Sequence, residues 1–400
     1  MLSVAFLSNA IGLTHDPLSK ARILLGVLGA IVLAVGLLGR RFARCYTVSV
    51  VMLANTLLLL VGLEFGATVV NRLMRYDEMP AYDAIQKEGS LAGVTKAFYV
   101  GWRGKPQQGF AVTVDEEGLR VTPPLSSDLV GDAIRVFTFG GSTMWGEGAT
   151  DEETIAAYLQ QMLSAGTGFT VRVTNYAQRA WVSSQSLIQL TLELQRGHVP
   201  DVVVFYDGYN EIFAAYATER TGVPENFAGF SHDSSAESIL SRVQTTELGK
   251  LLGALRPRLE REIAVDELAV AVTHTYAQVM RLVQALGREY GFASRFYWQP
   301  QLLGDPKTLT PDELTLLNHP WLPPAVKQLT AAVHVRVEEL AAEEEVFVDL
   351  RDVFEGIGAP IYHDPCHIRG AGNKRVAEVM LERGLLDDVR ESTAATRPPD

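Results

Sequence analysis

The stretch Ile134-Arg-Val-Phe-Thr-Phe-Gly-Gly-Ser142-Thr143 places a β-branched and aromatic run directly before two glycines and a serine. Such a run is typical of a buried strand that ends in a tight turn. A turn after a strand is also where α/β sheets present their functional side chains. Ser142 is therefore the first candidate for a functional residue, although a serine after two glycines is also an ordinary turn residue.

C-terminal to this stretch, strand-like and helical patterns alternate. Short runs rich in Val and Phe are separated by longer segments with apolar residues at helical spacing. This alternation predicts a parallel sheet covered by helices on both faces, with ligands bound beyond the carboxyl ends of the strands. The expected strands are Ile134–Phe139, Phe169–Thr174, Val202–Tyr206, Ser294–Trp298 and Val346–Asp349, and the expected helices are Glu152–Leu163, Ser184–Arg196, Ile263–Tyr290, Ala325–Glu343 and Gly370–Arg383.

Two apolar, uncharged runs near the N-terminus, Ile23–Gly39 and Cys45–Leu63, are each close to the ~20 residues that span a bilayer as a helix. They predict a membrane anchor over residues 1–72, with transmembrane helices at about 22–39 and 45–65. A buried helical hairpin of a soluble core is the alternative. A cleaved signal peptide is disfavoured because about twenty residues, including Asp16, precede the first run.

The charges that flank these runs favour one orientation. The turn between the runs contains Arg40, Arg41 and Arg44. The positive-inside rule places such a turn in the cytoplasm. We therefore expect a multi-pass protein of the inner membrane, bound to the lipid bilayer through its N-terminal hairpin, with the α/β domain extracytoplasmic or periplasmic.

The remaining segments differ in composition from the α/β domain. Residues 73–132 are expected to form a juxtamembrane linker with a β-hairpin, because the alternating run Phe110–Val114 and the run Leu119–Thr122 flank the turn signal Asp115-Glu-Glu-Gly118. The α/β domain is predicted over 133–386, with an insertion at about 212–261, where Pro, Gly and Ser cluster. Residues 387–400 are expected to be a flexible tail.

Composition also excludes some classes of partner. The net charge of −12 argues against nucleic acid, whose binding depends on phosphate neutralisation by Lys and Arg. His198, His274 and His334 are scattered and show no metal-ligand spacing. We therefore expect no metal and no cofactor.

A second chemical motif, Asp364-Pro-Cys-His367, lies near the C-terminus. Together with Ser142 it supplies a nucleophile, a base and an acid that orients the base, which serine-based acyl transfer requires. Asn210, just after the third strand, adds an amide donor for an oxyanion. The alternatives are structural: Asp364 as a helix cap, Asn210 as an Asx-turn residue, and Cys366 as packing.

The order Gly-Gly-Ser142, Asn175 with its following loop, Gly208-Tyr-Asn210 and Asp364-x-x-His367 resembles the SGNH (GDSL-type) hydrolase superfamily, over about 134–385. The resemblance implies a flavodoxin-like three-layer α/β/α sandwich. It also implies Ser142 as nucleophile, His367 as general base and Asp364 as its partner. The implied oxyanion hole consists of the backbone N–H groups of Ser142 and Ala180 and the side chain of Asn210.

Three positions depart from the family's pattern. Ala180 occupies the glycine position of the Asn-x-x-x-x-Gly loop, and an alanine does not easily reach every conformation open to glycine. Gly141 stands where many members have Asp, and Glu211 where the family usually has Asp. The oxyanion hole is thus the part of the site in which this chain differs most.

The resemblance and the expected anchor together predict a membrane-anchored, metal-independent serine esterase that hydrolyses O-acyl, foremost O-acetyl, esters on an extracytoplasmic polysaccharide or glycan. The alternatives are an O-acyltransferase on the same substrates, a lipase or phospholipid esterase, and a non-catalytic binding or scaffold protein. Trp145, Arg179 and Gln299 follow strand-like runs and are therefore candidate substrate contacts.

Overall fold

The computed structural model describes residues 20–37, 43–74, 85, 88, 93–125, 133–225, 246, 248–249, 262–318 and 322–396. The chain forms two compact units. One consists of Met1–Tyr76 with Ser238–Pro257, and the other of Asp77–Glu237 with Arg258–Asp400.

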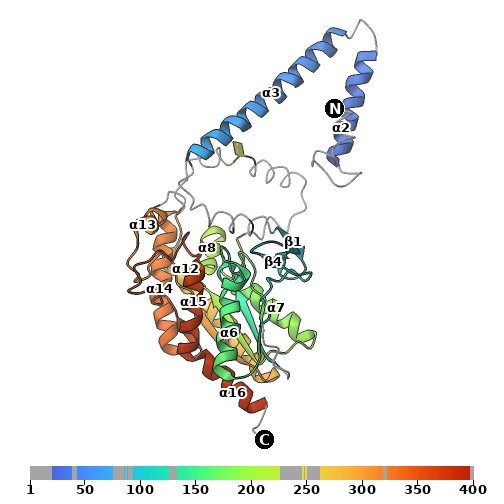
Figure 1. Ribbon diagram of the computed structural model, residues 1–400. Helices are drawn as coiled ribbons and strands as arrows, with labels where there is room; N and C mark the ends of the chain where they lie inside the picture. Colours follow the sequence, from blue (N-terminus) through green and yellow to red (C-terminus); the bar gives the residue numbers. More distant parts are fainter. Residues whose placement is uncertain are drawn as a thin grey trace. The chain divides into compact units, whose positions relative to one another are not determined.

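The first unit contains two apolar helices, α2 (Lys20–Leu37) and α3 (Ala43–Met74) (Figure 1). They lie where the sequence predicts helices, and α3 is longer than expected. Within α3, Thr47–Val70 is long and apolar enough to cross a membrane. Its side chains are exposed or half-buried except for Ala67, which is buried. One described helix therefore meets the criteria for a span, and the two-helix transmembrane hairpin stays a prediction.

The second unit is built on a five-stranded parallel sheet, as the sequence predicts. Its strands are β5 (Ile134–Gly140), β6 (Val171–Asn175), β7 (Val202–Asp207), β8 (Ala293–Trp298) and β9 (Phe347–Asp349). They are ordered β6-β5-β7-β8-β9, the flavodoxin-like order of a doubly wound sheet. Gly140 pairs with Tyr206, so the carboxyl ends of β5 and β7 are adjacent.

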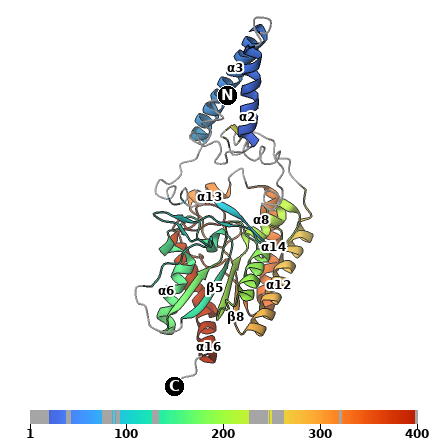
Figure 2. The same ribbon diagram turned by 90° about the vertical axis from the view of Figure 1, so that its right-hand side faces the viewer.

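Helices cover both faces of the sheet, because successive strand side chains alternate between two apolar cores. Val136 and Val204 face the first core and Phe137 and Phe205 the second. Figure 2 shows the two layers of helices with β5 and β8 between them. The first core is covered by α6 (Ile155–Thr167), α15 (Gly370–Met380) and α16 (Leu386–Thr396), and the second by α7 (Ser183–Gln195), α12 (Val265–Tyr290) and α14 (Pro324–Glu343).

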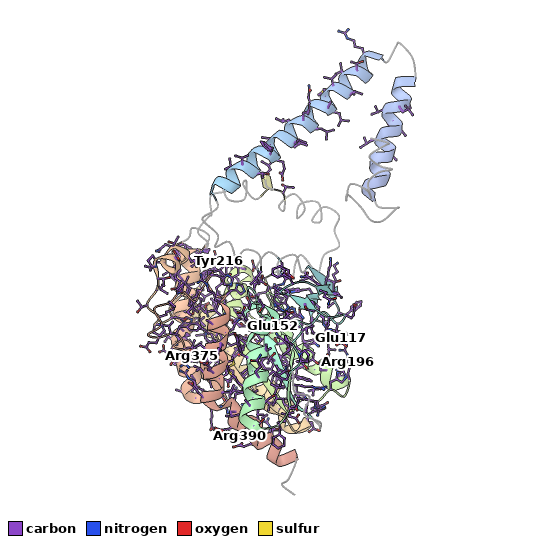
Figure 3. All side chains as sticks on the ribbon, viewed as in Figure 1. Glu117, Glu152, Arg196, Tyr216, Arg375 and Arg390 are labelled. Carbon is purple, nitrogen blue, oxygen red and sulfur yellow. The ribbon has the colours of Figure 1, made fainter. Side chains whose placement is uncertain are left out.

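The covering helices turn their charged side chains outward. The half-exposed Arg375 of α15 and the exposed Arg390 of α16 lie on the outer surface (Figure 3).

The short helical elements lie in the connections: α5 (Ser142–Trp145), η1 (Asp151–Glu153), α8 (Tyr209–Thr218), α13 (Pro311–Leu317) and η2 (Leu381–Leu385).

Two short antiparallel strand pairs precede the sheet. One pairs β1 (Val94–Ala97) with β2 (Gly101–Gly104), and the other β3 (Gln107–Gln108) with β4 (Thr113–Val114). The expected turn at Asp115–Gly118 is present, since Gly118 N donates to Asp115 O at 3.0 Å. The strands on either side of it are shorter than predicted, with a single bridge between Val114 and Arg120.

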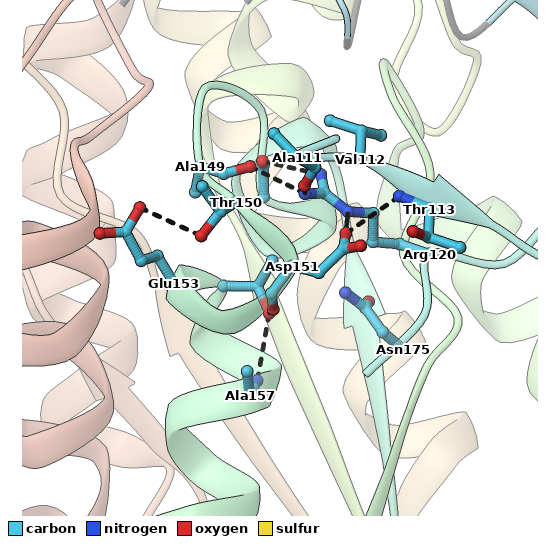
Figure 4. Close-up of polar contacts among 12 residues, drawn as sticks. Ala111, Val112, Thr113, Arg120, Ala149, Thr150, Asp151, Glu153, Ala157 and Asn175 are labelled. Carbon is cyan, nitrogen blue, oxygen red and sulfur yellow. Dashed lines mark hydrogen bonds and ion pairs between the residues drawn. The ribbon is translucent and has the colours of Figure 1, made fainter. Parts of the chain in front are cut away.

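Arg120 fastens this N-terminal segment to the α/β core. Its side chain is fully buried. Nε lies 2.6 Å from Asp151 Oδ1, and the other guanidinium nitrogens donate to three backbone carbonyls (Figure 4). These belong to Ala111 (3.2 Å), Gly146 (3.1 Å) and Ala149 (2.8 Å).

Two expected boundaries differ from the structure. The insertion expected from 212 begins later, because Ile212 and Ala215 are buried against the second core and keep α8 helical to Thr218. Most of the expected insertion lies outside the described residues. The tail expected from 387 forms α16 as far as Thr396, since Val389 is buried in the first core and Asp388 pairs with Arg295 at 2.6 Å.

Candidate active site

Ser142 is the first residue of α5 and follows the carboxyl end of β5. The rest of this short helix, Thr143 to Trp145, is buried, which fixes the turn. Asn175, at the end of β6, donates from Nδ2 to Met144 O at 3.0 Å. Gln178 N donates to Gly140 O at 3.2 Å. The neighbouring strand and its following loop thus hold the serine in place at the edge of the sheet.

Ser142, His367 and Asp364 lie in one hydrogen-bonded chain, although Ser142 and His367 are 225 residues apart. Ser142 Oγ is 2.6 Å from His367 Nε2. His367 Nδ1 is 2.5 Å from Asp364 Oδ2. With the proton on Nδ1, the imidazole donates to the carboxylate and accepts from the serine hydroxyl, which is the arrangement of a nucleophile, its base and the acid that orients the base.

The loop that carries His367 and Asp364 is rigidly held. Asp364 Oδ1 accepts from the N–H groups of Cys366 (2.9 Å) and His367 (2.7 Å). Glu313 Oε1 accepts from the N–H groups of Ile361 (2.9 Å) and Tyr362 (3.1 Å), just before the loop. The imidazole is therefore oriented by the backbone as well as by its carboxylate partner.

Burial and pairing act in opposite directions on these two groups. Burial alone would lower the pKa of His367, but the charge of Asp364 and the hydrogen bond to it raise this pKa well above its usual value. Burial would raise the pKa of Asp364, but the charge and hydrogen bond of His367 hold it well below its usual range. The site therefore stabilises an imidazolium beside a carboxylate, which is the state formed when the serine loses its proton.

Two hydrogen-bond donors meet around Gly141. Ser142 is the first residue of its helix, so its N–H has no partner within the helix. The side chain of Asn210 lies directly against Gly141, where an added Cβ would be 2.2 Å from Asn210 Nδ2. The same Nδ2 donates to Trp181 O at 2.8 Å, which leaves its second hydrogen for another acceptor. The Ser142 amide and the Asn210 carboxamide are thus neighbours.

The loop Gln178–Trp181, in which the sequence predicts one oxyanion donor, follows β6 and is called the oxyanion loop below. Ala180 has a φ of 59°, in the left-handed region that favours glycine, as its position in the motif requires. In the part of the chain that the structure describes, no group accepts the Ala180 N–H. Ala180 therefore takes the backbone conformation expected of glycine and keeps its N–H available.

The expected substrate contacts lie close to the site but differ in exposure. Trp145 is only 1% exposed, and the guanidinium groups of Arg120 (4.6 Å) and Arg179 (5.0 Å) both lie over its ring. Gln299 is 3% exposed and accepts from Thr143 Oγ1 at 3.2 Å. The more exposed Arg179 has surface to offer to a substrate, whereas Trp145 and Gln299 support the nucleophile turn from within.

Two neighbours of the imidazole stay neutral around pH 7. The ring of His363 stacks on that of His367 with centroids 5.6 Å apart, and burial lowers the pKa of His363 to about 4. Burial raises the pKa of the Cys366 thiol to about 11. A ligand atom from each of His363, Asp364 and His367 lies within 4.8 Å of the others. Because Asp364 and His367 already bond to each other, a metal ion there would have to break that pair.

Sequence patterns gave no signal for a buried pair of carboxyl groups behind Asn210. Glu211 accepts from Ser183 N (2.7 Å) and Gly208 N (2.9 Å), so it ties α7 to the start of α8. Burial and the charge of Glu211 raise the pKa of Asp207 well above its usual value. The bond from Gly208 N to Glu211 is only the carboxylate half of a capping box, since glycine has no side chain, and this local spacing does not predict burial of the pair.

No protein-family model matches the sequence, and no curated protein matches it. Solved structures similar to this chain include an acetyl xylan esterase, AlAXEase, with a TM-score of 0.36 and 12% identity over 62% of this chain and 98% of that chain. A G-D-S-L family lipolytic protein from Veillonella parvula DSM 2008 has a TM-score of 0.36 and 13% identity over 62% of this chain and 97% of that chain. For the acetylxylan esterase Axe2 from Geobacillus stearothermophilus the values are 0.33 and 15%, over 64% and 95%.

These structures are described as two acetyl xylan esterases and a lipolytic protein. The activity of this chain is inferred from Ser142, His367, Asp364 and their surroundings.

Proposed function

We propose that the protein is a membrane-anchored serine esterase of the SGNH type. The observation that carries this proposal is the unbroken chain from Asp364 through His367 to Ser142, with separations of 2.5 and 2.6 Å, at the carboxyl edge of a parallel sheet. A purely structural serine or histidine has no need of both bonds together with unused amide donors beside them.

In the proposed reaction, Ser142 Oγ attacks the ester carbonyl carbon while His367 Nε2 takes its proton. The resulting oxyanion accepts hydrogen bonds from Asn210 Nδ2 and from the N–H groups of Ser142 and Ala180. The intermediate then expels the alcohol, which takes the proton from His367. Water, deprotonated by His367, then attacks the acyl carbon, and the bond to Ser142 Oγ breaks. The carboxylic acid leaves, and Oγ takes the proton back from His367, which returns the free enzyme.

We propose O-acyl groups, foremost O-acetyl groups, on an extracytoplasmic polysaccharide or glycan as the substrate. Support comes from the apolar segment Thr47–Val70, which suits a bilayer by length and composition. The arginine-rich turn before it favours a domain outside the cytoplasm. In this proposal the second span, α2, completes a hairpin that keeps the enzyme at the cell envelope.

The test uses the full chain in detergent micelles with methylumbelliferyl acetate, butyrate and octanoate. We expect hydrolysis with a preference for acetate. In Ser142→Ala the rate should fall by a factor of about 10³ or more. Ser184→Ala is the matched control, because Ser184 is also a half-buried serine at the start of a helix. A Ser142→Ala variant that keeps the wild-type rate would refute the proposal. A preference for octanoate would instead favour a lipid ester.

A further inference from the structure

We propose that the hairpin formed by β1 and β2 sets the direction of the Ala180 N–H, and that Trp102 is the positioning residue through which it does so. This inference rests on the proposed esterase function, because it concerns an oxyanion donor. It gives the segment before the sheet a role in the reaction.

Trp102 and the oxyanion loop hold each other by reciprocal hydrogen bonds. Trp102 Nε1 donates to Arg179 O at 2.8 Å, and Trp181 Nε1 donates to Trp102 O at 3.2 Å. Trp102 and Trp181 are 2% and 1% exposed and pack together with Val100 in a separate apolar cluster, against which Ala180 also packs. Water therefore has little access to replace these bonds.

A second set of bonds joins the same two segments. Gln178 Oε1 accepts from Gly104 N at 2.9 Å, and Gln178 Nε2 donates to Gly118 O at 2.8 Å. Gln185 Nε2 donates to Val100 O at 2.6 Å. The oxyanion loop is thus fastened to the N-terminal segment on both sides of Ala180.

The bond from Trp102 matters because of peptide geometry. Arg179 C=O and Ala180 N–H belong to one planar peptide unit, and the peptide bonds of the structure are trans. In a trans unit the two groups point in opposite directions, so fixing the carbonyl fixes the N–H. A donor on the carbonyl also polarises the N–H and strengthens the hydrogen bond it gives.

The peptide unit on the other side of Ala180 is held as well, because its N–H, that of Trp181, donates to Gln178 O at 3.3 Å. The next carbonyl, Trp181 O, accepts from Asn210 Nδ2. Ala180 therefore lies between two anchored peptide units, and this explains how an alanine is kept at a φ of 59°. Without the hairpin, Ala180 would relax toward negative φ and turn its N–H away. A glycine at this position would depend less on the hairpin.

The test compares Trp102→Phe, which keeps the ring but removes the donor, with the full-length wild type. We expect kcat for methylumbelliferyl acetate to fall about tenfold, which corresponds to ~1.4 kcal/mol, with KM unchanged within about twofold. The pH profile should keep its inflection, because the pair of Asp364 and His367 is not touched. Adding Ala180→Gly to Trp102→Phe should bring kcat to within about threefold of Ala180→Gly alone.

Tyr297→Phe is the matched control. It removes another buried hydrogen bond to a backbone carbonyl, from Tyr297 OH to Met380 O at 3.1 Å, in the first core. We expect its kcat to equal that of the wild type. An equal loss of kcat in Tyr297→Phe, or no recovery with Ala180→Gly, would show that Trp102 acts only on stability and would overturn the proposal.

Hydrogen–deuterium exchange separates this proposal from the proposed function. In Trp102→Phe, amides of peptides covering 178–181 should exchange faster than in the wild type, and in Tyr297→Phe they should not. Unchanged exchange in Trp102→Phe would overturn the role of the hairpin even if the enzyme is an esterase. The result for Ser142→Ala decides the esterase function independently.

Discussion

Replacing Gly141 by alanine should displace one donor of the proposed oxyanion hole without touching the proposed triad of Ser142, His367 and Asp364. The backbone at Gly141 has φ −86° and ψ −156°, which alanine adopts without strain. The added Cβ, however, would lie 2.2 Å from Asn210 Nδ2. Since non-bonded heavy atoms normally stay about 3.5 Å apart, the carboxamide has to move by about 1 Å.

A shift of that size takes Asn210 Nδ2 away from the oxyanion and from Trp181 O. Removing one oxyanion donor typically costs about 10²–10³ in kcat, or roughly 2.7–4 kcal/mol of transition-state stabilisation. We expect Gly141→Ala to lose activity by this factor with little change in KM. Asn210→Ala should show a loss of the same size.

The double variant shows whether Gly141→Ala loses activity because its methyl group displaces the Asn210 side chain. Once Asn210 is alanine, the methyl group at 141 has room, so Gly141→Ala with Asn210→Ala should be no slower than Asn210→Ala alone. Gly358→Ala is the control, since nothing lies within 4 Å of its added Cβ. The measurement is kcat for methylumbelliferyl acetate, with thermal unfolding to check the fold. Wild-type kcat in Gly141→Ala, or losses that multiply in the double variant, would refute this reasoning.

Two further predictions concern titration. Asp364 raises the pKa of His367, and the base must be neutral to act, so kcat should rise with pH through an inflection above 6.5. Asp364→Asn should lower the pH of that inflection and reduce kcat by about 10⁴. An unchanged inflection in the pH–rate profile of this variant would contradict the prediction. Asp207 Oδ1 is buried without a hydrogen-bond partner, and the pKa of Asp207 is raised in the folded protein. As pH rises above about 4, the Asp207 carboxyl ionises in the unfolded chain before it does so in the folded one, and the free energy of unfolding therefore falls. Asp207→Asn should therefore increase the free energy of unfolding at pH 8 by about 1–3 kcal/mol, and by less at pH 5, in urea titrations; a decrease at pH 8 would count against it.

The sheet was predictable because its central strands are rich in β-branched and aromatic residues: β7 is buried along its whole length, and β5 is buried except at Arg135. All five observed strands begin and end within two residues of the expected positions, as β5 does at Ile134–Gly140. The position of Ser142 followed from a motif at a strand end, and those of Asp364 and His367 from their spacing in Asp364-Pro-Cys-His367. The first hairpin was missed because β1, Val94–Ala97, is short and its central residues Thr95 and Lys96 are exposed.

The direction of the side chains could not be predicted from the sequence. Placement after a strand shows which edge of the sheet a residue occupies, but not whether its side chain faces inward. Trp145 and Gln299, which were expected to contact substrate, are buried. The partners of Trp102 and Arg120 lie in distant loops, and no local pattern reports such contacts. The conformation of Ala180 could be expected only as that of the glycine it replaces.

The buried guanidinium of Arg120 also determines how this protein can be cut and recombined. A piece that began at the first strand of the sheet would leave Asp151 as a carboxylate without its cation, and the carbonyls of Gly146 and Ala149 without donors. Such a fragment loses bonds on the turn just behind the nucleophile. Because Val100, Trp102 and Gly104 also bond to residues 178–185, the smallest transferable module starts before β1, and gene fusions or domain swaps should join the chain upstream of Val94.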